Sequence, residues 1–201
     1  MLKFYIKGFP ARKAFFYFGT EGMDKTQTHY FKTLDLIYIA VFAGIGIAIK
    51  PLTASISGFL KTIIPLPGGS ILGIIYSSIL FTGAGLVKKP GAASLIGIIQ
   101  AILVLVISFG GHGGLSFITY TFPCFLAEVI ILIFRKLETL PSFILSAGMF
   151  NSVGAALIII LYQRATVNAT VILIGCSIAF IMGALGGIIA NRTVRLIEKV
   201  L

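Results

Sequence analysis

Long apolar runs separated by short basic hinges are the feature that most constrains this chain. The clearest hinge is Lys88-Lys89-Pro90-Gly91, which separates the apolar run 69–87 from the run 92–109. A helix of about 20 apolar residues spans the hydrocarbon core of a bilayer, and a charged hinge between two such runs marks a return to water. The pattern repeats along the chain and predicts a protein that crosses the membrane several times.

The composition does not fit a soluble domain. The chain is 58% hydrophobic and 11% charged, whereas a typical soluble domain has about 25% charged residues. The net charge of +10 does not indicate nucleic-acid binding, because nearly all basic residues lie at the ends of the apolar runs. Cys124 and Cys176 lie inside apolar runs, which favours buried free thiols over a disulfide or a zinc site.

The apolar runs predict an all-α integral membrane protein that forms a bundle of six transmembrane helices. The predicted spans are residues 34–49, 69–87, 92–109, 115–134, 142–162 and 169–190. The intervening segment 51–68 is too apolar for a free loop and is interrupted by Lys61, Pro65 and Pro67. We expect it to lie against the outer face as a short helix or a re-entrant cap. No Lys or Arg falls inside a predicted span.

The basic residues predict the orientation of the bundle. If the N-terminus lies inside, only Lys50, Lys61 and Arg164 of the 16 basic residues lie outside, and the other thirteen are cytoplasmic. Such a bias follows the positive-inside rule. Both termini are therefore expected in the cytoplasm, and the protein is expected in the cell membrane.

Residues 1–32 form a basic and aromatic N-terminal segment that lacks the continuous apolar core of a signal peptide. Two interpretations stay open. The segment is either an amphipathic stretch on the inner leaflet or an over-extended translation start, with Met23 as the true first residue. Residues 33–201 form the predicted membrane domain.

Small residues recur at every fourth position on the first and last spans. The stripe on the first span is Ala40, Gly44 and Ala48, and the stripe on the last is Gly175, Ala179, Gly183 and Gly187. In lipid, small residues allow two helix backbones to approach closely. Each stripe is therefore expected either to pack inside the bundle or to dock a partner protein.

Six polar residues in the spans and one outer loop are candidates for substrate binding: Tyr76, Gln100, His112, Tyr120, Glu128 and Asn151. Polar groups at this depth are costly and tend to face the bundle interior or a cavity. Gln100 and Asn151 fall near the midpoints of their spans, so they can meet at similar depth. The alternative for each residue is a hydrogen bond between helices.

Glu128 and His112 pose separate questions. With no basic residue inside a span, the Glu128 carboxyl is expected to be protonated, to reach cytoplasmic cations such as Arg135, or to meet a cationic ligand. His112 lies in the loop 110–114, and the four remaining residues of this loop are all glycine. Glycine accepts many backbone conformations, so this loop is either a lid over a ligand or a solvated connection.

The sequence carries no motif of catalysis or nucleotide binding. It has no His-Glu-x-x-His helix, no Gly-x-Ser-x-Gly turn and no glycine-rich loop that ends in Lys-Ser or Lys-Thr. We therefore expect no enzyme activity, no cofactor, no bound metal and no ATPase within this chain.

Together these features resemble the substrate-binding S components of energy-coupling factor (ECF) transporters. The six spans, the small-residue stripe on the first span and the capping segment after it carry this resemblance. More narrowly, the hinge 88–93, Ala127-Glu128, Leu140-Pro141 and the stretch 147–153 are similar to the branch associated with thiamin and its hydroxymethylpyrimidine precursor. That branch carries acidic residues on the third span, whereas this chain is apolar there apart from Gln100.

The resemblance implies a vitamin-binding subunit of an ECF-type ABC importer. The subunit would dock through Ala40, Gly44 and Ala48 onto a transmembrane coupling subunit that bears two ATPase subunits. ATP turnover would then topple the subunit in the lipid and release its ligand inside the cell.

Two alternatives to a vitamin-binding subunit stay open. The first is a subunit of a cobalt or nickel permease. Metal-specific S components use a His at the second position, whereas Leu2 follows Met1 here, and Asp24 follows Met23. The second alternative is a membrane scaffold or membrane enzyme without a transport ligand.

Overall fold

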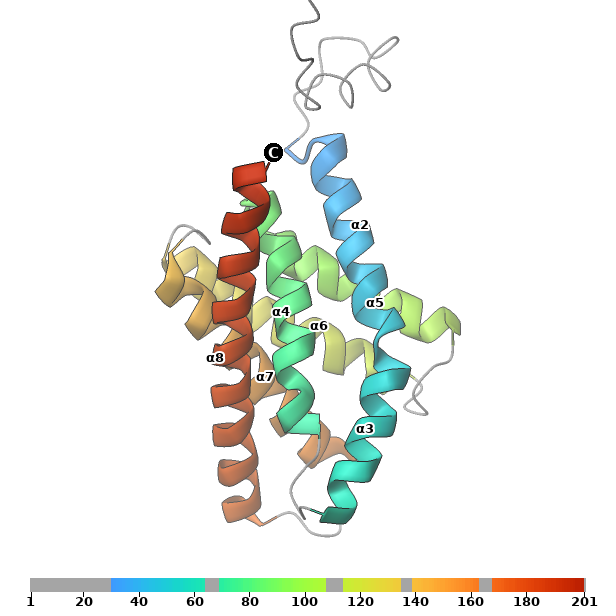
Figure 1. Cartoon of the computed structure of the whole chain (residues 1–201). Coiled ribbons are helices and arrows are strands. Elements are labelled where there is room, and N and C mark those ends of the chain that lie inside the picture. Colours follow the sequence, from blue (N-terminus) through green and yellow to red (C-terminus); the bar gives the residue numbers. More distant parts are fainter. Residues whose placement is uncertain (1–29, 64–68, 108–113, 135–138, 163–167, 201) are drawn as a thin grey trace, which may run out of the picture.

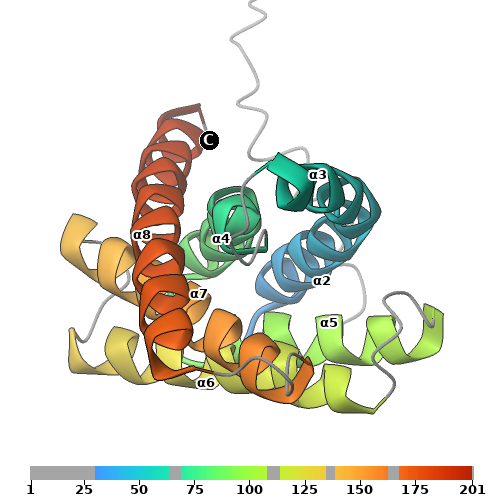
Figure 2. The same cartoon turned by 90° about the horizontal axis from the view of Figure 1, so that it is seen from below.

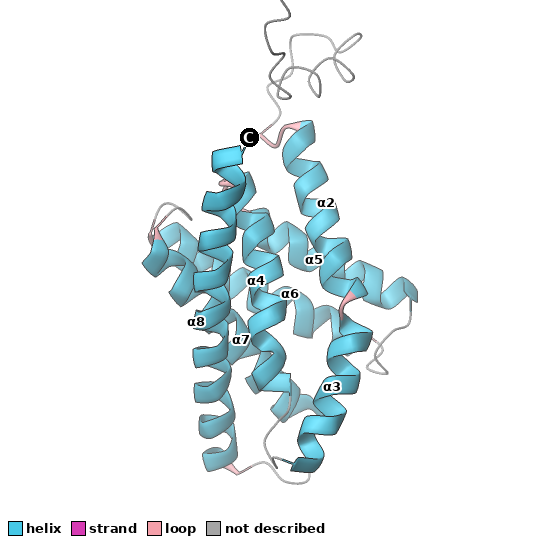
Figure 3. Cartoon of the chain, in the orientation of Figure 1, coloured by secondary structure: helices cyan, strands magenta, loops and turns pink. Residues whose placement is uncertain are grey.

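The computed structural model describes residues 30–63, 69–107, 114–134, 139–162 and 168–200. Within these ranges every regular element is a helix (Figure 3). The helices are α2 (Thr33–Ala48), α3 (Lys50–Ile63), α4 (Gly69–Val87), α5 (Ala92–Ile107), α6 (Leu115–Ile133), α7 (Leu140–Tyr162) and α8 (Ala169–Val200). The predicted spans match α2 and α4 to α8 closely, except that α8 continues from the expected end at Ala190 to Val200.

The helices have the length and composition of a multi-pass membrane protein. Four stretches are long and apolar enough to cross a membrane: Thr33–Phe59, Leu115–Ile133, Leu140–Leu161 and Ala169–Val200. Two shorter apolar helices, Leu72–Val87 and Ala92–Ile107, complete the set. These six apolar units agree with the six spans expected from the sequence.

The helices α2 and α3 are two parts of one bent helix. Helical hydrogen bonds continue on both sides of the bend, from Ile49 N–H to Ile45 O at 3.1 Å and from Thr53 N–H to Ile49 O at 3.0 Å. Pro51 has no N–H to donate to the preceding turn, and this loss bends helices. The predicted capping segment is therefore helical, but it continues the first span (Figure 1).

The bend changes the position expected for one basic residue. Lys50 is the first residue of α3 and lies within the candidate span Thr33–Phe59. The candidate span is therefore longer than the predicted span 34–49, and it includes a lysine that the prediction placed outside.

The helix α4 lies near the middle of the bundle, between the α2–α3 helix and α8 (Figures 1 and 2). The most extensive packing is that of α8 against α7 and α4. The first and last described residues lie at the same end of the bundle (Figure 1). We call this end, which also holds the hinge between α4 and α5, the terminal end, and the opposite half the distal half.

Charged residues meet at the terminal end. Lys89 Nζ lies 2.6 Å from Asp35 Oδ2 at the start of α2, and Lys88 forms an ion pair with Glu198 near the end of α8. The hinge between α4 and α5 is thereby tied to both the first and the last helix.

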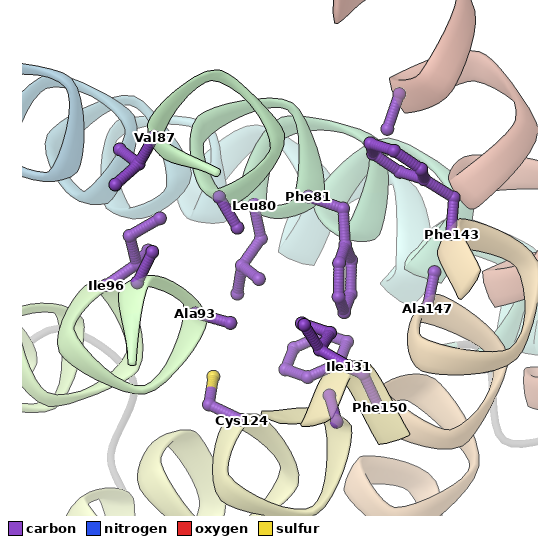
Figure 4. Packing of buried hydrophobic residues seen from close by; sticks show 14 of the residues in the cluster. Leu80, Phe81, Val87, Ala93, Ile96, Cys124, Ile131, Phe143, Ala147 and Phe150 are labelled. Atoms are coloured by element: carbon purple, nitrogen blue, oxygen red, sulfur yellow. The ribbon is translucent and has the colours of Figure 1, made fainter. Parts of the chain in front are cut away.

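The apolar core occupies the terminal half. Its residues come from the middle of α2, the late part of α4, the early part of α5, the late part of α6, the early part of α7 and the late part of α8. Figure 4 shows Leu80, Phe81, Ala93, Ile96, Cys124, Phe143, Ala147 and Phe150 of this core. Both cysteines are free thiols, as predicted, although only Cys124 is buried and Cys176 is half-buried.

The two small-residue stripes have different environments. Gly175, Ala179, Gly183 and Gly187 of α8 are all buried. A Cβ at Gly187 would lie 2.8 Å from the carbonyl carbon of Phe143 on α7, so the two backbones are in contact there. On α2, Ala40 and Ala48 are exposed, and no atom of a neighbouring helix lies within 4 Å of a Cβ built at Gly44. The α8 stripe therefore packs inside the bundle, and the α2 stripe lies on its surface.

Candidate functional site

Tyr76 of α4 joins several of the predicted polar residues in the distal half. Its hydroxyl donates a hydrogen bond to Gln100 Oε1 on α5. Its ring meets the Tyr120 ring of α6 edge-on at 6.5 Å between centroids and packs on the Phe150 ring of α7 at 5.5 Å. Tyr76 therefore links four helices at the distal edge of the apolar core.

Gln100 is fully buried, and only one of its two polar side-chain atoms has a hydrogen-bond partner among the described residues. Its Oε1 accepts the Tyr76 hydrogen bond, but its Nε2 has no hydrogen-bond partner among the described residues. The amide lies against Gly46 of α2, where a Cβ would be 3.3 Å from Gln100 Cδ. A buried donor left without a partner costs about 1–3 kcal/mol, so packing alone does not account for this side chain.

Asn151 of α7 is in a similar situation. It is 9% exposed, and its Nδ2 also has no hydrogen-bond partner within the described part of the chain. Its amide packs against Gly73, which lies about one turn before Tyr76 on α4. The amides of Gln100 and Asn151 therefore pack on different helices, and neither amide nitrogen donates to the other.

Lys50 completes this group, although sequence analysis placed it outside the membrane. Its Nζ lies 4.0 Å from the ring centroid of Tyr76 and 4.7 Å from that of Tyr120. Both distances are within the range of a cation–π interaction, which extends to about 6 Å. The residue itself is half-buried. We call Lys50, Tyr76, Gln100, Tyr120 and Asn151 the distal polar cluster.

The sequence contains a signal that could have identified Lys50. It is a single lysine between two apolar helical segments, and it directly precedes Pro51, the residue at the bend. The orientation argument treated Lys50 only as a charge outside the membrane, and this hid its position between two apolar helical segments. No signal in the sequence marks Gly46 and Gly73 as the residues that accommodate the two amides.

Glu128 lies apart from the cluster and has a different set of partners. Gly91 N–H donates to its Oε1 at 2.7 Å, and the N–H groups of Ala93 and Ser94 donate to its Oε2 at 3.1 and 3.3 Å. These donors form the N-terminus of α5, where backbone N–H groups lack helical partners and favour a negative charge. Glu128 therefore caps α5 from α6. This role accounts for the carboxyl without protonation, a cytoplasmic cation or a cationic ligand, which were the three alternatives expected from the sequence. The candidate site therefore does not include Glu128.

The remaining expectations concern His112 and metal binding. His112 and residues 110–113 of the glycine loop lie outside the described residues. No group of three or more His, Cys, Asp or Glu residues that could hold a metal occurs in the described ranges. Nothing in this part of the chain therefore favours the metal-permease alternative.

Comparison with known proteins gives one informative match. No protein-family model matches the sequence, and no curated protein matches it. A solved structure described as the crystal structure of an S-component of ECF transporter superposes with a TM-score of 0.71. The match covers 84% of this chain and 86% of the other, at 20% sequence identity. The chain therefore has the fold of this S component.

Proposed function

We propose that this chain is the membrane-embedded substrate-binding subunit of an ECF-type importer, which captures a vitamin or a vitamin precursor from outside the cell. The observation that carries the proposal is the S-component fold, which extends over 84% of the chain. The chain supplies no ATPase motif, so transport requires a transmembrane coupling subunit and two ATPase subunits as partners.

The distal polar cluster is the proposed binding site. The rings of Tyr76, Tyr120 and Phe150 offer aromatic surface, and Gln100 and Asn151 add amide nitrogens without partners in the described chain. Ligand sites are typically apolar with a few fixed polar groups, and this combination suits a flat ring with a polar edge. The glycine loop around His112 is the proposed cover of the site.

The first candidates for the ligand are thiamin and hydroxymethylpyrimidine, because the motifs of the hinge and of α6 and α7 resemble that branch. Native mass spectrometry of the detergent-purified protein tests for a retained small molecule, and calorimetry tests both candidates directly. Retention or binding of a vitamin-like molecule supports the proposal. Chemical turnover of a substrate by the isolated chain would instead favour a membrane enzyme.

The outer stripe on α2 is the proposed docking surface for the coupling subunit. Gly44→Leu would fill the groove between Ala40 and Ala48 and prevent close helix approach. We expect this variant to lose co-purification with the coupling subunit and to keep its ligand affinity. Ser177→Leu is a matched control, because Ser177 is an exposed small residue on α8, on a different helix from the stripe. If Gly44→Leu and Ser177→Leu co-purify equally well, α2 is not the docking surface.

The proposed orientation places both termini in the cytoplasm. In a Cys176→Ser background, an impermeant thiol reagent applied to intact cells should label His112→Cys and spare Lys88→Cys. The reverse labelling pattern would contradict the orientation derived from the basic residues.

A further inference from the structure

Lys50 has no carboxylate partner within the described part of the chain. The chain has six acidic residues. Of the three that are described, Asp35 pairs with Lys89, Glu198 pairs with Lys88, and Glu128 accepts three backbone hydrogen bonds at α5. The other three, Glu21, Asp24 and Glu138, belong to the segments before α2 and between α6 and α7. Lys50, by contrast, follows the distal end of α2.

The described surroundings of Lys50 offer its ammonium aromatic contacts but no charged acceptor. The faces of Tyr76 and Tyr120 attract a cation, but a lysine also has three N–H donors that seek oxygen acceptors. An unpaired charge within a membrane span is costly and commonly marks a functional site. The aromatic contacts therefore hold the ammonium in place without neutralising its charge.

A second donor points to the same kind of ligand. Gln100 is fully buried and contacts the same tyrosine as Lys50, because its Oε1 accepts the Tyr76 hydroxyl. Its Nε2 remains without a partner among the described residues. The cluster thus presents an ammonium against the ring of Tyr76 and an amide that is bonded to its hydroxyl. The ammonium and the free amide N–H are both complementary to an oxygen anion.

We infer that the ligand of this site is a planar heteroaromatic compound with a carboxylate or phosphate group, which pairs with Lys50 and takes Gln100 as a second donor. The inference rests on the proposed function and narrows its substrate class. It disfavours both first candidates for the ligand. Hydroxymethylpyrimidine has no anionic group, and the positively charged thiazolium ring of thiamin would lie against aromatic faces that already contact the Lys50 ammonium. A phosphorylated or carboxylated ring compound fits the cluster better.

Two matched pairs of probes test the charge requirement. Nicotinate and nicotinamide differ in one carboxylate, and hydroxymethylpyrimidine monophosphate and hydroxymethylpyrimidine differ in one phosphate. Calorimetry on the purified full chain should show, for at least one pair, that the anionic member binds about 10- to 100-fold more tightly, as expected for a hydrogen bond between charged groups. The pair that shows the preference distinguishes a carboxylate from a phosphate ligand.

The variants Lys50→Met, Lys50→Gln and Lys50→Arg assign the preference to this residue. The preference should disappear in Lys50→Met and Lys50→Gln and persist in Lys50→Arg. Lys199→Met is the matched control, because it removes one positive charge at the terminal end and should leave the preference unchanged. Because Lys50→Met and Lys50→Gln both remove the charge, either one can be tested if the other fails to fold.

The outcomes separate this inference from the proposed function. If the neutral member of each pair binds as tightly as the anionic one, or if the preference survives in Lys50→Met, the inference is overturned and the binding function stands. If a neutral or cationic molecule is extracted from the wild-type protein, the inference is likewise overturned and the binding function stands. If the wild-type chain neither binds any probe nor retains any molecule, both proposals are contradicted.

Discussion

The two halves of the bundle differ in how their charged and amide side chains are satisfied. In the terminal half, the charges of Asp35 and Glu198 are paired with lysines, and Glu128 accepts three backbone hydrogen bonds. In the distal half, Lys50 faces two aromatic rings, and Gln100 and Asn151 each retain an amide nitrogen without a partner among the described residues. The hydroxyls of Ser94, Ser142 and Ser146 in the terminal half also have no partner among the described residues, so the contrast concerns charged and amide groups only. For these groups, folding explains the first arrangement and does not explain the second.

This difference supports the proposed location of the binding site in the distal half. Unsatisfied polar groups are costly in a membrane because no water is available to solvate them. Groups retained despite that cost are expected where a ligand supplies the missing partners. Substitutions in the terminal half should therefore affect stability, and substitutions in the distal half should affect binding.

The largest effect on stability is expected for Glu128→Ala. The change leaves three N–H groups at the start of α5 without their charged acceptor, which should lower the free energy of unfolding by about 3 kcal/mol or more. Glu198→Ala is the control, because its ion pair is partly exposed and should contribute less than about 1 kcal/mol. Thermal unfolding in detergent measures both, and equal losses would contradict the capping role of Glu128.

An intermediate effect is expected for Gly187→Ala, with Gly73→Ala as the matched change in the distal half. In both positions the new Cβ would lie 2.8 Å from a carbon atom of α7. At Gly187 that atom is the backbone carbonyl carbon of Phe143, which cannot move alone. At Gly73 it is Asn151 Cγ, in a side chain that can rotate. We expect a loss of about 1–3 kcal/mol for Gly187→Ala and less for Gly73→Ala.

If Gly73→Ala proved as destabilising as Gly187→Ala, the distal half would be packed as rigidly as the terminal half. The two halves would then not differ in how their polar side chains are held. Ligand affinity should show the opposite order, because Gly73→Ala displaces the Asn151 amide of the proposed site.

The smallest effect on stability is expected for Lys50→Met without ligand. The variant loses two cation–π contacts, worth about 0.5–1 kcal/mol each at exposed sites, and gains by removing an unpaired charge from a membrane span. The melting temperature in detergent should therefore stay close to that of the wild-type protein. A loss comparable to that of Glu128→Ala would assign Lys50 a structural role.

The sequence predicts the architecture well because membrane helices depend on simple local properties. Runs of apolar residues and basic hinges located six helical units, and the structure agrees at nearly every boundary. The same approach could not distinguish the stripe of α2 from that of α8. Both have small residues at four-residue spacing, and only the packing of the other helices determines which one is covered.

The site was only partly predictable for a related reason. Tyr76, Gln100, Tyr120 and Asn151 were identified as polar residues at membrane depth, and the structure brings the first three into one connected group and places Asn151 beside it. Lys50 was not identified, because a charge at the predicted end of a span is expected to face water. Its position depends on the bend at Pro51, which extends the first span beyond that end.

The most direct test of the central claim is the effect of Gln100→Leu on two properties of the same protein. The change removes one unpaired donor but leaves the Tyr76 hydroxyl without its acceptor, so the two effects oppose each other and the melting temperature should change little. The affinity for the anionic probe should fall by about 10- to 100-fold. Calorimetry and thermal unfolding of the purified variant provide both values. A variant that loses stability but binds with wild-type affinity would show that the distal polar cluster holds the helices together and does not bind the ligand.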